Sequence, residues 1–302
     1  KEHRENGRAD YSARPVVPKE GTMRHLRMAS LLVLAWCGIV QASGLEYAER
    51  YARLYLSTAV KIRCHPDSSR YGTAFLTKNP KNPSQLVLTT NKHLVQHAKE
   101  LEVRIPIKDT SGVIVDSWTA RIPLYRDTVT QFFTPESDLD LALVPVERDW
   151  LRKPGGPTVH FSSLTYSFYA EMRNLVPGQS VVFTGYPLDI MVNGNQPLLR
   201  RGTIAGVDTV KNRIYLDADA FGGSSGSPVF INYDSPLHHE FLTTYGEFFV
   251  GMIAGYVPFE KWLVDRETGR PEMRQTENSG IAVVVPAETI RLFADSLFQM
   301  RR

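Results

Sequence analysis

The segment that most constrains the fold is a glycine-rich turn that runs directly into an apolar strand, residues 222–230 (GGSSGSPVF). Glycine adopts backbone conformations that other residues avoid, so such a turn can direct two neighbouring amides at one point. It can also expose the hydroxyl of Ser225 beside those amides. Two converging amides stabilise the oxyanion of an acyl-transfer intermediate, and removing one such donor costs about 3–4 kcal/mol. Because Gly/Ser clusters are also common in ordinary turns, this interpretation depends on partners elsewhere in the chain.

Two further segments contain the partners that a nucleophilic serine needs. An apolar strand in VLTTNKHLV leads to His93, and DLDLALV carries Asp140 into another apolar strand. The chemistry requires a base that takes the serine proton and later returns it, and a carboxylate that orients this base. We therefore predict Ser225 as the nucleophile, His93 as the general base and acid, and Asp140 as the orienting carboxylate. The amides of Gly223 and Ser225 are the predicted oxyanion hole.

Three neighbouring residues compete for these roles. His97 lies past the strand end on an expected helical turn, and Asp138 stands beside Glu136 and Ser137, where we expect it to be solvated. Ser224 satisfies the Gly-x-Ser-x-Gly pattern of an α/β-hydrolase, which requires a helix after the serine and a histidine downstream. Here the next residues, PVFI, form a strand pattern and the matching histidine lies upstream. The pattern therefore favours Ser225 over Ser224.

Taken together, these ordered motifs resemble the trypsin/chymotrypsin superfamily, especially its bacterial glutamyl endopeptidases and Deg/Htr-type proteases. TNKHLV resembles their histidine motif, GSPVF their serine motif and YGTAFL the strand before the histidine strand. RGTIAG and GIAVVVP are similar to a late strand and the closing strand of Deg/Htr proteases. The resemblance runs from about Thr58 to the C-terminus. It implies an all-β fold of two orthogonal antiparallel β-barrels, with the active site in the cleft between them. No PDZ-sized extension follows the predicted protease domain, so no PDZ domain is expected.

Two departures from the family pattern affect what can be carried over. Ser224 stands where animal members have an aspartate that pairs with a newly cut N-terminus, so we expect the site to form without such trimming. Bacterial members usually have Asn there, which leaves open how Ser224 completes the hydrogen bonds of the turn. Ile253 is nearest the position of the histidine that glutamyl endopeptidases use for a substrate carboxylate. Specificity for Glu is therefore not expected.

The residues predicted to contact the substrate leave two preferences open. Asp219 precedes the nucleophile by six residues, where trypsin-like members place the aspartate that binds Lys or Arg. A carboxylate at the base of a pocket strongly favours a cation. Asp217 is a structural alternative two residues earlier. Ala254, Gly255 and Tyr256 are the expected opposite edge, where Tyr256 would narrow the pocket and favour small side chains instead.

The charge distribution separates a basic N-terminal segment from a neutral body. The chain has 35 Lys/Arg and 32 Asp/Glu, of which residues 1–44 hold seven and four, leaving 28 of each. Nothing in this balance indicates nucleic acid or an anionic membrane as a partner. Residues 23–42 have the basic start, short apolar run and small final residues of a signal peptide. We therefore expect a secreted or periplasmic protein, with an uncleaved anchor as the alternative and residues 1–22 as a disordered leader or upstream translated sequence.

Signal cleavage would leave Cys64 as the sole cysteine, so no intramolecular disulfide is expected and core burial must hold the fold. We expect Cys64 to be buried at a strand end. Cys64 and its neighbour His65 lack the distant pair of ligands that a metal site needs. His238 and His239, with Asp234 and Glu240, are a weak metal candidate, and a solvated loop is favoured there. We therefore predict no metal and no cofactor, and a polypeptide as the substrate. Sequence does not indicate an oligomeric state.

Hydrophobic periodicity predicts two sets of strands. The first set would form a barrel over about 58–150: strands 59–64, 71–77, 85–90, 101–107, 113–122 and 141–146. The second would form a barrel over about 171–285: strands 180–184, 198–206, 213–217, 228–232, 247–254 and 280–285. A linker at 152–170 would connect them, and amphipathic helices are expected at 45–56 and 286–300.

One alternative function stays open at this stage. Residues 232–247 form an insertion that is apolar enough to cover a site or to dock a partner. The chain could then be a protease-fold binding module with a closed or regulated cleft. Because all three triad residues are present, the sequence favours the enzyme.

Overall fold

The structure, a computed structural model, describes residues 52–108, 113–127, 129–136, 138–151, 162–165, 169–194, 196–232 and 248–300. They belong to one compact unit, Ala48–Arg302. The predicted signal peptide, the leader and nearly all of the 232–247 insertion lie outside the described residues. Residues 52–56 are helical, and the remainder of the predicted helix 45–56 also lies outside them. No helix in the described part is both long and apolar enough to cross a bilayer.

The N-terminal half forms a seven-stranded sheet, here called the first sheet, with the hydrogen-bonded order β5-β4-β1-β2-β3-β8 and with β9 paired to β2. The strands are β1 (Ala59–His65), β2 (Tyr71–Lys78), β3 (Leu86–Thr90), β4 (Glu100–Lys108), β5 (Ile114–Pro123), β8 (Ala142–Val146) and β9 (Ser163–Leu164). A small pair, β6 (Tyr125–Arg126) and β7 (Val129–Thr130), lies outside this sheet, and η1 (Arg148–Leu151) follows β8. Alternating apolar residues such as Ile62, Leu88 and Leu101 are fully buried in its core. The pair β2–β9 is parallel, inside the stretch predicted as a linker.

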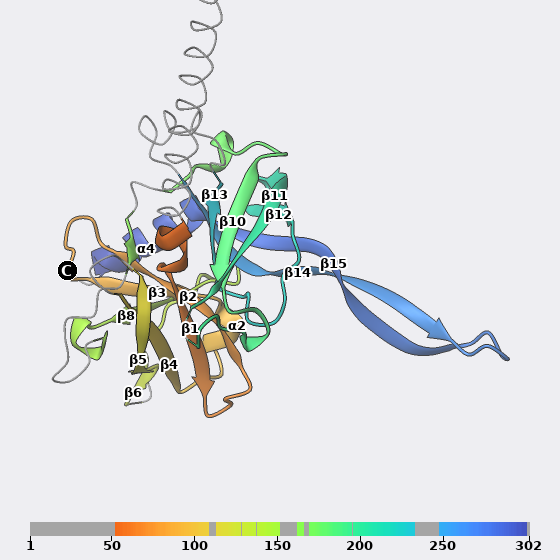
Figure 1. Cartoon of the computed structure of the whole chain (residues 1–302), viewed down its shortest axis with the longest axis horizontal. Helices are drawn as coiled ribbons and strands as arrows, with labels where there is room; N and C mark the ends of the chain where they lie inside the picture. Colours follow the sequence, from red (N-terminus) through yellow and green to blue (C-terminus); the bar gives the residue numbers. More distant parts are fainter. Residues whose placement is uncertain are drawn as a thin grey trace, which may run out of the picture. The chain divides into compact units, whose positions relative to one another are not determined.

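The C-terminal half closes into a barrel, here called the second barrel, in the order β10-β11-β12-β15-β14-β13 (Figure 1). Its strands are β10 (Ser180–Gly185), β11 (Leu198–Asp208), β12 (Arg213–Asp217), β13 (Pro228–Ile231), β14 (Phe249–Val264) and β15 (Pro271–Pro286). Two short 3-10 turns, η3 (Met172–Asn174) and η4 (Pro187–Asp189), precede and follow β10. Phe183, Ile214 and Val284 are among its buried core residues. The prediction of an all-β, chymotrypsin-like fold with a C-terminal helix is confirmed.

A shared apolar cluster joins the two halves. It contains Val87 and Leu143 from the first sheet, Phe230 from the second barrel, and Ile290 and Leu297 from helix α4 (Ala287–Met300). Each such buried side chain contributes roughly 2 kcal/mol. Helix α4 therefore packs against both halves and holds them together.

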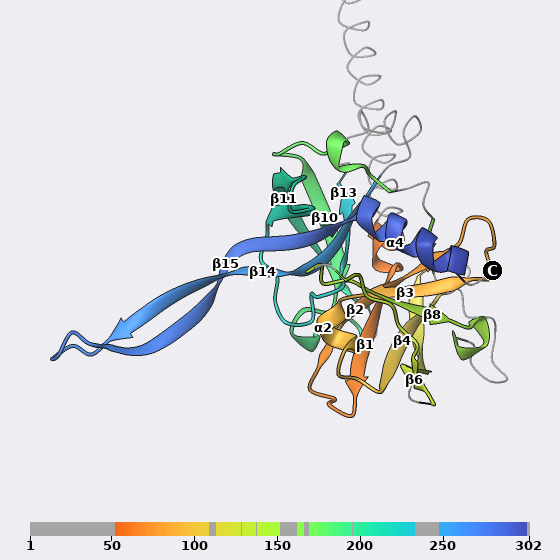
Figure 2. The same ribbon diagram turned by 180° about the vertical axis from the view of Figure 1, so that it is seen from behind.

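Strands β14 and β15 are much longer than the predicted strands 247–254 and 280–285, so that part of the prediction was wrong. Beyond the barrel, Pro258–Val264 pairs only with the segment 271–278. We call this two-stranded projection the ribbon, which extends away from the barrel in both views (Figures 1 and 2). Its apolar side chains are exposed, with Trp262 62% and Met273 60% accessible. Because these residues bury little apolar surface, the sequence lacks the alternating core-facing pattern that would predict strands there.

Candidate active site

His93 and Asp140 meet at the paired ends of two neighbouring strands. Antiparallel β3 and β8 place Thr90 opposite Ala142, so the residues just beyond these ends lie side by side. His93 is on the one-turn helix α2 (Lys92–Val95), immediately after β3. The Asp140 carboxylate lies 2.6 Å from Nδ1 of His93 and accepts a 2.9 Å hydrogen bond from the His93 amide. A carboxylate in this position holds the proton of the ring on Nδ1, which leaves Nε2 as the basic nitrogen.

Surrounding residues hold this pair in place. The side-chain amide of Asn91 donates to the Asp140 carbonyl at 2.7 Å, and the Arg70 guanidinium donates to the His93 carbonyl. The Cys64 thiol, 1% exposed, donates to the Leu94 carbonyl at 3.1 Å. Burial raises the pKa of the Cys64 thiol to about 11, so this donor stays protonated at neutral pH. The expectation of a buried, strand-end cysteine is confirmed.

The turn around Ser225 has the four successive carbonyls of residues 222–225 engaged by donors. The Leu188 amide donates to the Gly222 carbonyl at 2.7 Å, and the Thr73 hydroxyl donates to the Gly223 carbonyl at 2.8 Å. The Ser224 carbonyl accepts from the amide of the residue at 227, and the Ser225 carbonyl accepts from the Thr73 amide at 2.8 Å. These donors come from three different segments, so contacts distant in sequence shape the turn.

Two amides of the same turn remain available. Among the described residues, no group accepts a hydrogen bond from the amide of Gly223 or of Ser225. Gly223 has φ +91° and Gly226 has φ +87°, a region that favours glycine. A Cβ on Gly226 would lie 1.7 Å from the Thr73 carbonyl oxygen, so no larger residue fits there. The turn thus offers two free donors next to a serine hydroxyl, which is the requirement for binding an oxyanion.

Gly72 lies where the two halves of the site meet. A Cβ at this position would be 2.5 Å from Cδ1 of Leu94, the neighbour of His93, and 3.1 Å from the Ser225 carbonyl oxygen. Within the described residues, no hydrogen bond joins His93 to the Ser225 hydroxyl. Catalytic hydrogen bonds are often long in structures without substrate and tighten when it binds. Gly72 therefore lies in close contact both with the residue that follows His93 and with the backbone of Ser225.

The competing residues have other environments. Asp138 and His97 are exposed. Ser224 is 1% exposed, and its hydroxyl accepts a hydrogen bond from the Phe221 amide at 3.3 Å. Ser224 thus makes the internal bond of the turn, which answers the question raised by its replacement of Asn.

The predicted pocket residues flank β15 from two sides. The Asp219 carboxylate is exposed, lies 3.7 Å from a Cβ built on Gly280, and accepts no hydrogen bond from any described residue. Its backbone carbonyl accepts from Arg200 at 2.6 Å. Ala254 and Gly255 are half-buried on β14, and Tyr256 is 40% exposed opposite the residue at 282. Asp219 is therefore free to pair with a cation.

Sequence reasoning missed three residues that shape the site: Thr73, Leu188 and Asp189. Thr73 belongs to the quoted YGTAFL strand, but nothing indicated that its hydroxyl would reach Gly223. Leu188 and Asp189 have positive φ angles of 54° and 63° without being glycine, so no turn signal marked them. Their role depends on a fold that the local sequence does not reveal.

Comparison with known proteins assigns the family. The trypsin-like peptidase domain matches residues 72–235, more than half of the chain, so the chain belongs to this family. No curated protein matches it. Similar solved structures include the serine endoprotease from Yersinia pestis, with 16% identity, a TM-score of 0.46, and 83% of this chain and 68% of that one covered. Another is the HtrA-type protease AlgW with a tripeptide, with 13% identity, a TM-score of 0.46, and coverage of 82% and 63%.

Proposed function

We propose that the protein is a serine endopeptidase that hydrolyses peptide bonds through an acyl-enzyme, with Ser225, His93 and Asp140 as its triad. The observation that carries the proposal is the pair of free amides at Gly223 and Ser225. A turn in which the carbonyls of residues 222–225 are bound while these two donors stay unused is suited to stabilising an oxyanion. Family membership supports the peptidase class.

The proposed reaction proceeds in the following steps. The Ser225 hydroxyl attacks the substrate carbonyl carbon while His93 Nε2 takes its proton, and the Gly223 and Ser225 amides bind the resulting oxyanion. The intermediate then expels the amine, which receives the proton from His93, and an ester to Ser225 remains. Water, deprotonated by His93, hydrolyses that ester and restores the enzyme. Asp140 stabilises the cationic imidazole at each stage.

For the side chain before the scissile bond, we propose Lys or Arg, bound by Asp219 between β12 and β15. The unpaired carboxylate supports this preference, and Ala254, Gly255 and Tyr256 would line the opposite edge. A peptide-library digestion with the Asp219→Asn variant tests it. We expect cleavage after Lys and Arg to fall about tenfold or more relative to other sites. A wild-type preference for small residues would instead favour a pocket narrowed by Tyr256.

The activity itself is tested by labelling the full chain with a fluorophosphonate and digesting a peptide library, beside the Ser225→Ala variant. Labelling and cleavage that vanish in the variant would support the endopeptidase. Absence of both in folded wild-type protein would instead favour a binding module, with residues 232–247 covering the cleft.

We also propose export to the periplasm or the cell exterior, supported by the pattern of residues 23–42. N-terminal sequencing of protein recovered from each cell fraction tests this. Cytoplasmic protein that keeps residues 23–42 would contradict it.

A further inference from the structure

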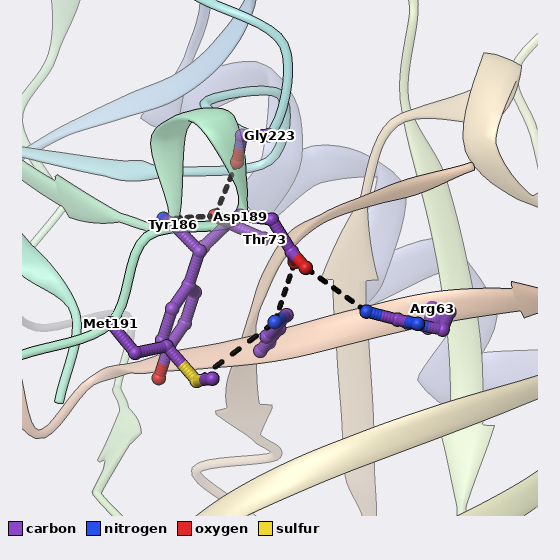
Figure 3. A network of polar contacts seen from close by, with 7 residues as sticks. Arg63, Thr73, Tyr186, Asp189, Met191 and Gly223 are labelled. Atoms are coloured by element: carbon purple, nitrogen blue, oxygen red, sulfur yellow. Dashed lines mark hydrogen bonds and ion pairs between the residues drawn. The ribbon is translucent and has the colours of Figure 1, made fainter. Parts of the chain in front are cut away.

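A cluster of three charged side chains lies beside the Ser225 turn and belongs to none of the proposed catalytic steps. Asp189, in η4, places one carboxylate oxygen 2.5 Å from the Lys61 ammonium and the other 3.0 Å from the Arg63 guanidinium. Both cations are on β1 of the first sheet. Figure 3 shows Asp189 bridging from η4 toward Arg63, next to the Thr73–Gly223 contact.

The environment of Lys61 makes this cluster a strong anchor. Its side chain is only 7% exposed, whereas those of Asp189 and Arg63 are 37% and 35% exposed. A buried ammonium without a partner is costly, so Lys61 holds the Asp189 carboxylate close. Lys61 is also paired across the sheet with Thr73, the residue that binds the Gly223 carbonyl. Two separate contacts thus lead from β1 and β2 to the same turn.

The connection from Asp189 to the turn runs through the preceding residue. The Leu188 amide donates to the Gly222 carbonyl at 2.7 Å. A trans peptide is planar, with its carbonyl and its N–H pointing in opposite directions. The Gly222 carbonyl and the Gly223 N–H belong to one such plane. Holding the carbonyl against Leu188 therefore aims the Gly223 N–H to the opposite side, where the oxyanion would bind.

This peptide plane has little to hold it besides Leu188. It lies between two glycines, for which rotation of the plane meets few steric barriers. Leu188 itself has φ 54° and ψ 28°, and Asp189 has φ 63°. Non-glycine residues adopt this conformation only when their surroundings impose it. Two backbone bonds of η4 contribute, from the Asp189 amide to the Tyr186 carbonyl at 3.2 Å and from the Ile190 amide to the Pro187 carbonyl at 3.0 Å. The ion pairs of Asp189 are the side-chain contacts that add to them.

We propose that Asp189 is a positioning residue for the oxyanion hole, which it controls through Leu188 and the Gly222–Gly223 peptide while anchored by Lys61 and Arg63. This inference rests on the proposed peptidase function. It adds that the first sheet sets the oxyanion hole of the second barrel through an ion-pair anchor.

The test compares Asp189→Asn with Glu100→Gln, a matched control. Glu100 is 33% exposed and pairs with Arg121 at 3.3 Å on the first sheet, without contacting the turn. We expect Asp189→Asn to lower kcat and the rate of fluorophosphonate labelling by about tenfold or more, with KM nearly unchanged. Glu100→Gln should retain both within about twofold.

A second readout does not depend on turnover: hydrogen exchange of the Leu188 amide, followed by NMR. Exchange in Asp189→Asn should be at least about tenfold faster than in wild type, because the bond to Gly222 opens more often. Unchanged exchange, or faster exchange with unchanged labelling, would overturn the proposal. If wild-type protein is not labelled at all, the peptidase proposal fails, and Leu188 exchange alone then decides for or against the anchor.

Because Asp189→Asn leaves the buried Lys61 without its charged partner, with the Met191 sulfur at 3.9 Å remaining, the variant could lose the fold. Arg63→Gln serves as the second variant, since it keeps the Lys61–Asp189 pair and removes only the more exposed contact. We expect a smaller loss of labelling rate, about threefold, with the melting temperature within a few degrees of wild type. A rate equal to wild type in Arg63→Gln, with unchanged Leu188 exchange, would overturn a role for the anchor when Asp189→Asn cannot be studied.

Discussion

The first sheet brings His93 and Asp140 together by direct contacts between adjacent strand ends, at 2.6 and 2.9 Å. The second barrel instead supplies Ser225 on a turn whose shape depends on donors from other segments, namely Thr73 and Leu188. One half of the site is thus built by direct pairing of two neighbouring strands, and the other by donors from separate segments around the turn. The first should tolerate changes around it, and the second should be sensitive to residues that never touch substrate.

Removing the carboxylate of the first half should have the largest effect. We expect Asp140→Asn to lower kcat about 10⁴-fold, because the amide no longer holds His93 in the required tautomer. Asp138→Asn is the matched control on the same segment, and its kcat should stay within about twofold of wild type. Steady-state kinetics on a peptide substrate measures both. Equal effects at the two positions would break the assignment of Asp140 to this half.

A change within the turn should come next. Gly226→Ala places a Cβ against the Thr73 carbonyl and requires φ +87°, so we expect fluorophosphonate labelling to slow about 10²-fold or more. Gly178→Ala is the control, since Gly178 has φ +90° with nothing within 4 Å of its Cβ. It should cost about 1 kcal/mol of stability without changing the labelling rate. If both variants are labelled equally slowly, the positive φ of the substituted residue, and not its contact with Thr73 on β2, would explain the loss of labelling rate.

Thr73→Val tests whether the second half depends on the first sheet. The variant loses the hydroxyl that donates to Gly223 and accepts from the Tyr186 amide, so kcat should fall about tenfold. Thr77→Val, on the same strand, removes a buried hydroxyl that contacts Thr89 and Tyr169 and should lower only the melting temperature. Thr73→Ser should restore most of the rate. A Thr73→Val enzyme with wild-type kcat would remove the distinction between the two halves.

The smallest expected effect concerns Cys64, which supports the His93 half through Leu94. Folding raises its thiol pKa from 9.0 to about 11, so the folded state keeps a proton that the unfolded state releases. The stability that this provides is complete below pH 9 and is lost as pH rises through 11. Alkylation at pH 8 should be about a hundredfold slower in native than in denatured protein. Cys64→Ala is the control, because it removes this pH dependence of stability and leaves only the alkylation of Cys37. Fast alkylation of Cys64 in native protein would show that the structure around His93 opens to solvent.

The accuracy of the sequence prediction follows the same division. The first-sheet pair was predictable because a strand pattern ending near His93 or leading from Asp140 defines where each side chain emerges. The glycines of the turn were predictable because their conformations require glycine. The role of Asp189 was not predictable, because it is 128 positions from Lys61 along the chain and only the folded structure brings the two side chains together.

The ribbon was missed for a different physical reason. Its strands carry charged residues that pair with each other, Lys261 with Glu277 at 2.5 Å and Arg274 with Glu260 at 3.3 Å. Neither of its faces covers a core, so the polar–apolar alternation that identifies barrel strands is weak there. Cross-strand pairs alone support it, and these are not visible without the register.

Strands β14 and β15 continue from the barrel into the ribbon, which is roughly 20 Å long. Where the barrel passes into the ribbon, β14 has two of its three irregularities, between Ile253 and Gly255 and between Tyr256 and Pro258. Ile253 lies on the barrel side of these irregularities, and its carbonyl accepts a hydrogen bond from the Gly226 amide in the Ser225 turn. The strand that extends into the ribbon is therefore the same strand that is hydrogen-bonded to the Ser225 turn.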